Sequence, residues 1–302
     1  MSIMPKAEKS FPAPARSGFS LVELLVVIAI IAILSSILLP ALAKAKARAH
    51  GVYSVNNSRQ LTVAVVLYAD DHRGTLPYNL DFTRSSPGDM SKNWVNNVLN
   101  WELSPDNTNS QAMLDSGIGP YTGDSAAIYR CPGDYAIGPV QSAAGWEKRV
   151  RSYSMNAMLG NVGVATESGE NINNPGYRQF FKIDSIPRPS DIAAFVEEHP
   201  DSINDGYFIN SYTSESAKKY STPVWMSLPA SDHDGMGVVS FSDGHSELHR
   251  WRGKSMKVPS RAYAIGSNGA GRPLKVERDS YQDFLWLIST MSIESRPEYS
   301  YH

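Results

Sequence analysis

The sequence has very little cysteine: Cys131 is the single one among 302 residues. An internal disulfide is therefore excluded, and a lone thiol says little about the redox compartment. An excess of one charge sign is also missing, because 28 basic and 30 acidic side chains give a net charge of −2. Nucleic-acid-binding proteins usually carry a basic excess, so the composition predicts that nucleic acid is not a partner.

Recognisable catalytic motifs are absent as well. The sequence contains no GxSxG, HExxH or phosphate-loop pattern. Cys131 precedes Pro132, and we expect it to be a buried small hydrophobic residue rather than a nucleophile. With 42% hydrophobic and 19% charged residues, most of the chain should be globular. These observations predict a protein that is not an enzyme.

One long apolar run is present, from Phe19 to Ala43. Between Leu24 and Leu39 it is interrupted by two serines alone. At about 1.5 Å of rise per residue, a helix over the whole run would reach the roughly 30 Å of a bilayer core. Lys6, Lys9 and Arg16 precede it and predict a cytoplasmic N-terminus.

Two ordinary interpretations of this run are a secretory signal and a plain signal anchor. A secretory signal would have a shorter apolar core that leads to a small-residue cleavage site. Here the run continues through Pro40 into the helix-favouring residues AKAKARAH. Neither interpretation explains Glu23, because a carboxylate inside a membrane segment costs about 2.5–3.5 kcal/mol and needs a partner or a function.

Residues 18–23, GFSLVE, resemble the type IV prepilin processing motif. The resemblance implies that a prepilin peptidase cuts between Gly18 and Phe19 and that the new Phe19 amine is N-methylated. Glu23, the fifth mature residue, would pair with the N-terminal amine of a neighbouring subunit during assembly. A buried carboxylate is much less unfavourable beside a cation than alone. Pro40 would occupy mature position 22, where pilins commonly carry a helix-bending proline.

This resemblance also predicts the domain organisation. Residues 1–18 would be the leader, 19–43 the transmembrane half of an N-terminal helix, and 44–302 a periplasmic or extracellular head. The protein would be a single-pass protein of the bacterial inner membrane. The helical pattern continues to about Asp71 and should stop there, because Gly74 and Pro77 follow.

The remainder of the chain predicts an α+β, pilin-like fold, in which the long helix packs on an antiparallel β-sheet head. A short helix is expected near Trp94–Leu103, and a terminal helix over Asp279–Met291 with Ser280 and Asp283 as its cap. Residues 265–273 contain three glycines and predict a loop. Strands are expected at Ile128–Arg130, Arg151–Met155, Ile192–Val196, Tyr207–Ile209, Val238–Phe241 and Ser246–Trp251.

A second resemblance involves His233, which is followed by nine residues and then Asp243-Gly244. This spacing looks like that of the prepilin-type processing-associated H-X9-DG proteins of bacteria. The likeness extends from Gly18 to about His249, with a departure at Gly51, near where many members carry a cysteine. It implies pilin-like processing and assigns no biochemical role beyond that. The resemblance to these H-X9-DG proteins also includes short stretches at residues 59–61, 68–71, 74–77, 130–132 and 152–156.

Asp243-Gly244 has a simple structural interpretation. Asp-Gly between two alternating runs predicts a two-residue hairpin turn. Such a turn would pair Val239 with Leu248, and Val238 with His249, while His233 packs beside it.

The alternative interpretation is a metal site. On a strand, His245, Glu247 and His249 would share one face, about 6.6 Å from one residue to the next alternate one. A site would need Glu247 with one of these histidines, plus His233 or Asp234 from elsewhere.

A calcium loop around Asp201 and Asp205 is a separate possibility, although its spacing does not match the twelve-residue calcium loop. We therefore expect no cofactor, with structural calcium as the alternative.

The leading functional hypothesis is a pilin or pseudopilin subunit of a type II secretion-like pseudopilus or a type IV pilus-like filament. Its expected partners are a prepilin peptidase, other pilin or pseudopilin subunits and the inner membrane. Two alternatives remain: a membrane-anchored surface binding module, and a metal-dependent enzyme that uses the His233–His249 region.

Overall fold

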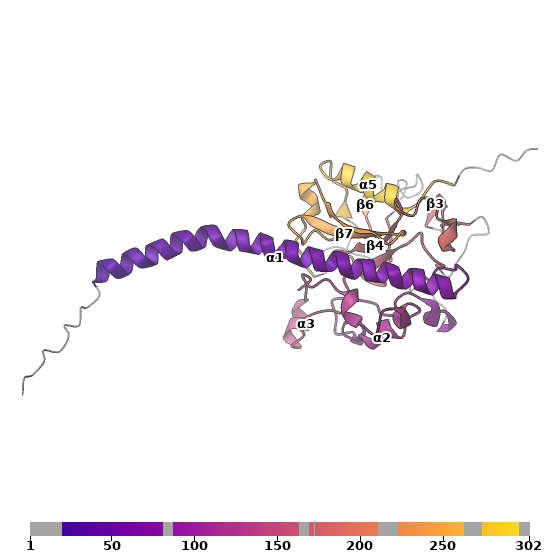
Figure 1. Ribbon diagram of the computed structural model, residues 1–302, viewed down its shortest axis with the longest axis horizontal. Coiled ribbons are helices and arrows are strands. Elements are labelled where there is room, and N and C mark those ends of the chain that lie inside the picture. The colour runs from indigo at the N-terminus through magenta and orange to yellow at the C-terminus, as the bar shows by residue number, and fades with distance from the viewer. Residues whose placement is uncertain are drawn as a thin grey trace, which may run out of the picture. The chain divides into compact units, whose positions relative to one another are not determined.

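The computed structural model describes residues 20–80, 87–162, 169–171, 173–210, 223–262 and 274–295 (Figure 1). The chain forms two compact units, one that ends at Ala45 and one that begins at Lys46. Each unit is described by itself below.

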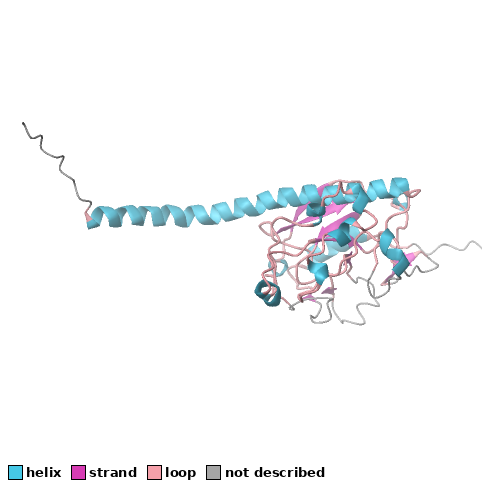
Figure 2. Ribbon diagram, turned by 90° about the horizontal axis from the view of Figure 1, so that it is seen from below, coloured by secondary structure: helices cyan, strands magenta, loops and turns pink. Residues whose placement is uncertain are grey.

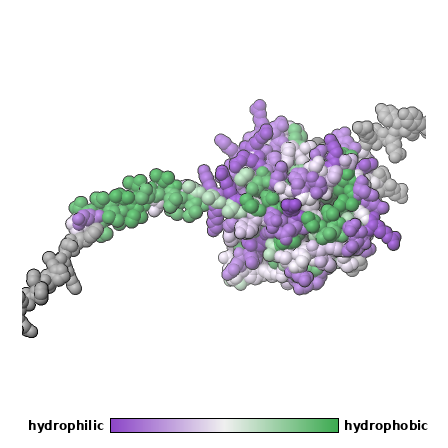
Figure 3. Space-filling model, in the orientation of Figure 1, coloured by the Kyte–Doolittle hydropathy of each residue, from purple (hydrophilic) through white to green (hydrophobic). Residues whose placement is uncertain are grey.

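Helix α1 (Leu21–Asp71) is the long N-terminal helix that the sequence predicts. It ends as expected at Asp71, shortly before Gly74, whose backbone φ is +80° and whose N–H donates to the Ala69 carbonyl at 2.7 Å. Glycine adopts this left-handed conformation without steric cost. The first part of α1 is long and apolar enough to cross a membrane, and none of its most apolar stretch is buried (Figure 3).

The second unit, here called the head, contains the strands of the structure (Figure 2). It is built around a five-stranded sheet with the order β5-β1-β4-β7-β8. Its strands are β1 (Tyr153–Asn156), β4 (Ala193–Glu197), β5 (Tyr207–Phe208), β7 (Met236–Phe241) and β8 (Ser246–Arg250). The prediction of an antiparallel sheet is wrong at one edge, where β5 runs parallel to β1. β4 runs antiparallel to β1, and the chain reverses direction after β4. The next strand, β5, pairs on the other side of β1 and therefore runs in the same direction as β1.

Smaller elements surround this sheet. Two short ribbons pair β2 (Glu170–Asn171) with β3 (Asn174–Arg178), and β6 (Val224–Trp225) with β9 (Leu274–Lys275). The remaining described α-helices are α2 (Gln111–Leu114), α3 (Pro139–Ala143) and α5 (Tyr281–Met291). Short 3₁₀ helices lie at Pro87–Lys92, Pro105–Asn107, Gly119–Tyr121, Ala126–Tyr129, Ile183–Ser185 and Lys254–Met256.

The sheet lies between α1 and α5. In β8, Leu248 points to α1, where it packs against Gly51, whereas the next residue, His249, stacks on Trp286 of α5 with 3.5 Å between ring centroids. Successive strand residues point to opposite faces of a sheet, which explains this division. On the α1 face, Thr62 donates a hydrogen bond to the Ser240 hydroxyl of β7 at 2.8 Å. The expected packing of α1 on the head sheet is thus confirmed for its second half.

Two local predictions are wrong. Residues 128–130 lie in a 3₁₀ turn and the extended residue after it, not in a strand, and the expected helix near Trp94–Leu103 is irregular. The irregular segment is rich in asparagine, whose side chains bond backbone groups in place of a helix ladder: Asn107 accepts from the Asn100 N–H at 2.9 Å. The predicted loop at residues 265–273 lies outside the described residues.

The hairpin between β7 and β8 is in the expected place, but its register differs by one residue. Val238 faces Leu248 and Val239 faces Glu247. The loop has three residues, 242–244, because the Gly244 N–H donates to Phe241 and Gly244 adopts φ +96°. A turn followed by a left-handed glycine is the usual three-residue hairpin, and Asp-Gly can end such a loop as well as form a two-residue one.

The terminal helix α5 is also in the expected place, but its predicted cap is wrong. Ser280 precedes the helix without making a side-chain cap. Its hydroxyl donates to the Glu277 carbonyl instead. Asp283 turns away from the helix start and accepts from the backbone N–H groups of Arg252 and Gly253, the latter at 2.7 Å. A tertiary contact therefore takes the carboxylate that the local pattern assigned to capping.

Candidate functional site

The start of α1 is closed by a reciprocal pair of hydrogen bonds between Ser20 and Glu23. The Ser20 N–H donates to Glu23 Oε2 at 2.9 Å, and the Glu23 N–H donates to the Ser20 hydroxyl at 3.2 Å. This is a capping box, which satisfies two of the N–H groups that have no partner inside the helix. The Ser-x-x-Glu pattern at residues 20–23 is the sequence signal for this cap. It aims the Glu23 carboxylate at the N-terminal end of the helix.

The other predicted processing and assembly residues are placed as follows. Gly18 and Phe19 lie outside the described residues, so their roles stay predictions. Pro40 lies inside α1, which continues through it although proline supplies no backbone N–H at that point. An assembly role for Pro40 also stays a prediction.

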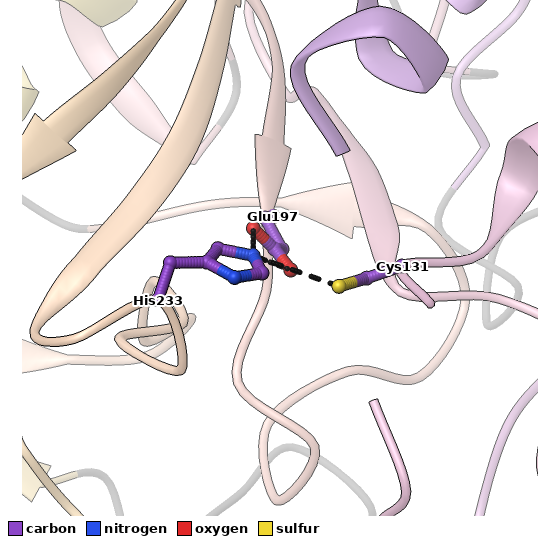
Figure 4. A group of neighbouring side chains, drawn as sticks. All are labelled: Cys131, Glu197 and His233. Carbon is purple, nitrogen blue, oxygen red and sulfur yellow. Dashed lines mark hydrogen bonds and ion pairs between the residues drawn. The ribbon is translucent and has the colours of Figure 1, made fainter. Parts of the chain in front are cut away.

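The histidine of the H-X9-DG pattern lies in a second site, a buried cluster in the head formed by Cys131, Glu197 and His233 (Figure 4). Their exposed fractions are 0%, 1% and 0%. His233 Nε2 lies 3.0 Å from both carboxylate oxygens of Glu197 and 3.5 Å from the Cys131 sulfur. Glu197 is the last residue of β4, His233 precedes β7, and Cys131 follows the Ala126–Tyr129 turn. We call this group the Cys–Glu–His cluster.

Helix α1 holds His233 from the other side. His233 Nδ1 lies 3.1 Å from the Ala47 carbonyl, and Asp234 accepts a 2.8 Å salt bridge from Arg48. Gly51 allows the helix to come this close, because a Cβ there would lie 3.1 Å from His233 Cγ. His233 therefore connects α1 to the sheet.

Charges inside the cluster favour a cation next to Glu197. Burial disfavours the protonated imidazole, but the hydrogen bond and the charge of Glu197 outweigh it and raise the pKa of His233. Burial and the Glu197 carboxylate together raise the pKa of Cys131. A thiol in these surroundings is protonated and a poor nucleophile. The predicted burial of Cys131 is confirmed.

The structure does not gather the predicted metal ligands of β8 around His233. His245 contacts Asp243 at 2.6 Å and stacks on Phe241, and Glu247 lies 3.7 Å from His249 Nδ1. His249 faces α5, whereas His233 lies on the α1 face with Leu248, so strand alternation separates them.

Within the described ranges, the Cys–Glu–His cluster is the one group of three or more histidine, cysteine, aspartate or glutamate side chains whose ligand atoms lie close enough to share an ion. Sequence reasoning missed two of its members, Cys131 and Glu197. They lie 102 and 36 residues before His233, and no local spacing links them.

Asp201 and Asp205, the predicted calcium ligands, have separate protein partners. Asp201 accepts from the Arg261 N–H at 2.8 Å and from the Ser260 hydroxyl at 3.2 Å. Asp205 accepts from the Tyr207 N–H at 3.1 Å, within its own turn. The geometry thus ties each carboxylate to neighbouring backbone rather than to a shared position.

One comparison with known proteins identifies the N-terminal part of the chain. A family model described as the prokaryotic N-terminal methylation motif matches residues 14–39. No curated protein and no solved structure matches the chain. The matched residues include the cap formed by Ser20 and Glu23 and the apolar start of α1. These findings support a prepilin-type protein with one N-terminal apolar helix, as fits a membrane-anchored single-pass chain.

Proposed function

We propose that the protein is a pilin-like structural subunit, cut by a prepilin peptidase between Gly18 and Phe19 and N-methylated at Phe19. It would assemble with other pilin or pseudopilin subunits into a type II secretion-like pseudopilus or a type IV pilus-like filament. The H-X9-DG pattern from His233 to Gly244 suggests that the chain belongs to a bacterial prepilin-type family. The observation that carries the proposal is the methylation motif at residues 14–39, which overlaps the exposed apolar start of α1.

The exposed surface of α1 supports an assembly role. Leu21 is 79% exposed and Ile37 is 71% exposed, and apolar side chains between them are exposed as well. A continuous apolar surface of this kind requires lipid or other apolar helices around it. Packing of the same helix from several subunits would bury it, while lipid would cover it before assembly.

The capping box supports the proposed role of Glu23. Glu23 uses Oε2 for the Ser20 N–H, at the first turn of the helix. Its Oε1 would accept the methylated amine of a neighbouring subunit. The carboxylate is then paired inside the apolar assembly, which removes most of its cost.

The test is intact-mass and N-terminal analysis of the full chain after co-expression with a prepilin peptidase. The expected product lacks residues 1–18 and begins with an N-methylated Phe19. Gly18→Ala should block cleavage, whereas Ser17→Ala, one residue earlier, is the matched control and should be cut. Glu23→Ala should be cut but should no longer co-purify with partner subunits.

Two outcomes would contradict the proposal. A wild-type chain that stays uncut, or that is cut at another bond, would leave a signal-anchored protein. A Gly18→Ala chain that is processed like wild type would show that another protease acts on the leader.

A further inference from the structure

The Cys–Glu–His cluster has no part in the proposed processing and assembly, and its proton arrangement is unusual. The Ala47 carbonyl can only accept, so its 3.1 Å contact with His233 Nδ1 is a hydrogen bond when Nδ1 carries the ring hydrogen. Nε2 then faces the two carboxylate oxygens of Glu197 at 3.0 Å. A neutral ring would place its Nε2 lone pair against the oxygen lone pairs. In that tautomer a proton, on the ring or on the carboxyl group, or a metal ion must lie between Nε2 and the carboxyl oxygens.

The spacing of the three side chains matches the coordination shell of a small metal ion. Around tetrahedral zinc, ligand bonds of about 2.0–2.3 Å place nitrogen and sulfur about 3.6 Å apart, and nitrogen and oxygen about 3.4 Å apart. The sulfur of Cys131 lies 3.5 Å from His233 Nε2, and all three ligand atoms lie within 4.8 Å of one another. A shift of roughly 0.4 Å would open the contact between His233 and Glu197 to the zinc spacing.

Neighbouring backbone groups orient all three side chains. The Ala47 carbonyl accepts from His233 Nδ1, which leaves Nε2 as the ligand atom. The Val238 N–H donates to Glu197 Oε2 at 3.2 Å, and the Gly133 N–H contacts the Cys131 sulfur at 3.2 Å. Metal-binding histidines almost always donate their other ring N–H in this way, and ligand carboxylates are hydrogen-bonded in turn.

We propose that the Cys–Glu–His cluster binds one zinc ion through Cys131 Sγ, a Glu197 oxygen and His233 Nε2, with a water molecule as the fourth ligand. Thiolate, imidazole and carboxylate together suit zinc, whereas calcium needs six to eight oxygens. The ion joins β4, the segment before β7 and the Cys131 loop, and through Ala47 it fixes α1 to the sheet. We assign the ion a structural role because it joins segments that are far apart in the sequence.

The test uses the purified, untagged full chain in detergent, loaded with Co²⁺ as a spectroscopic substitute for zinc. We expect one Co²⁺ per chain, displaced by Zn²⁺, with ligand-field bands of a four-coordinate ion. A thiolate-to-cobalt charge-transfer band should also appear. Because Cys131 is the one cysteine of the chain, this band can only come from Cys131.

Variants give the proposal its specificity. Cys131→Ser is nearly isosteric, so the head should fold, lose the charge-transfer band and bind Zn²⁺ roughly 100-fold more weakly. His233→Gln should also lose tight binding. His245→Gln is the matched control, since His245 is an exposed histidine that pairs with Asp243, and its binding should equal that of wild type.

The results that overturn the proposal are equally definite. Failure of the folded wild-type chain to bind one Co²⁺ or Zn²⁺ would mean that a proton alone lies between His233 and Glu197. Binding that Cys131→Ser leaves unchanged, or that His245→Gln abolishes, would place the ion elsewhere.

Discussion

Glu198 should make the stability of the head fall as pH rises, and the structure gives the size of the effect. This glutamate is 2% exposed, and its Oε1 accepts from the Ser202 hydroxyl at 2.9 Å. Burial raises its pKa from an ordinary 4.5 to about 7, although nearby hydroxyl groups and Arg151 oppose the shift. The folded state therefore holds a proton that the unfolded chain releases at lower pH.

The sign follows from this difference in proton binding. Below pH 4.5 both states are protonated at Glu198, and the group costs nothing. Between pH 4.5 and 7 the unfolded state loses the proton first, so the free energy of unfolding falls. A shift of this size corresponds to about 3 kcal/mol, reached above pH 7. Glu198→Gln keeps the shape of the protonated side chain and removes its titration.

The assay is urea unfolding of the full chain in detergent, followed by tryptophan fluorescence from pH 4.5 to 8. All six tryptophans lie beyond Ala45, so the signal reports the head. The free energy of unfolding of Glu198→Gln, measured relative to that of wild type, should be about 3 kcal/mol higher at pH 8 than at pH 4.5. The free energy of unfolding also falls as pH rises through the raised pKa of His233. This contribution is the same in both proteins, so their difference reports Glu198 alone.

Glu277→Gln, at an exposed position, is the control and should keep a constant difference from wild type. Parallel curves for wild type and Glu198→Gln would refute the reasoning.

Two further predictions concern glycines, and both can be checked by urea unfolding at pH 5. Gly51→Leu should lower the free energy of unfolding by about 1–3 kcal/mol, because its Cβ would lie 3.0 Å from Leu248 and 3.1 Å from the fixed ring of His233. The control Val52→Leu, on the exposed side of the same helix, should leave it unchanged. Equal stabilities of the two variants would contradict the packing. Gly244→Ala should cost about 1 kcal/mol through its backbone alone, since φ is +96° and nothing lies within 4 Å of the added Cβ. Gly244→Asn should cost less, because asparagine tolerates positive φ, and an Ala variant as stable as wild type would rule out the strain.

Local patterns predicted α1 well, because its start, length and end depend on residues near each other. The apolar run, the helix formers after Pro40 and the stop at Gly74 were all legible without tertiary information. The β7–β8 hairpin was located for the same reason. Its register could not be obtained, because Asp-Gly is compatible with both a two-residue and a three-residue loop.

Contacts between distant segments were decided by the tertiary structure alone. Asp283 looked like a helix cap but accepts from the backbone at Arg252 and Gly253. The parallel edge strand β5 follows from the path of the chain around β1, which no local pattern encodes.

By itself, the sequence determined a methylation motif, an apolar helix start and a head with α+β content, since each depends on composition and short-range periodicity. The tertiary structure decided which buried polar side chains meet. It separated His233 from His249 by placing them on opposite faces of the sheet. It joined His233 to Cys131 and Glu197, because the ends of separate segments converge under α1 and burial forces polar groups there to find partners in one another.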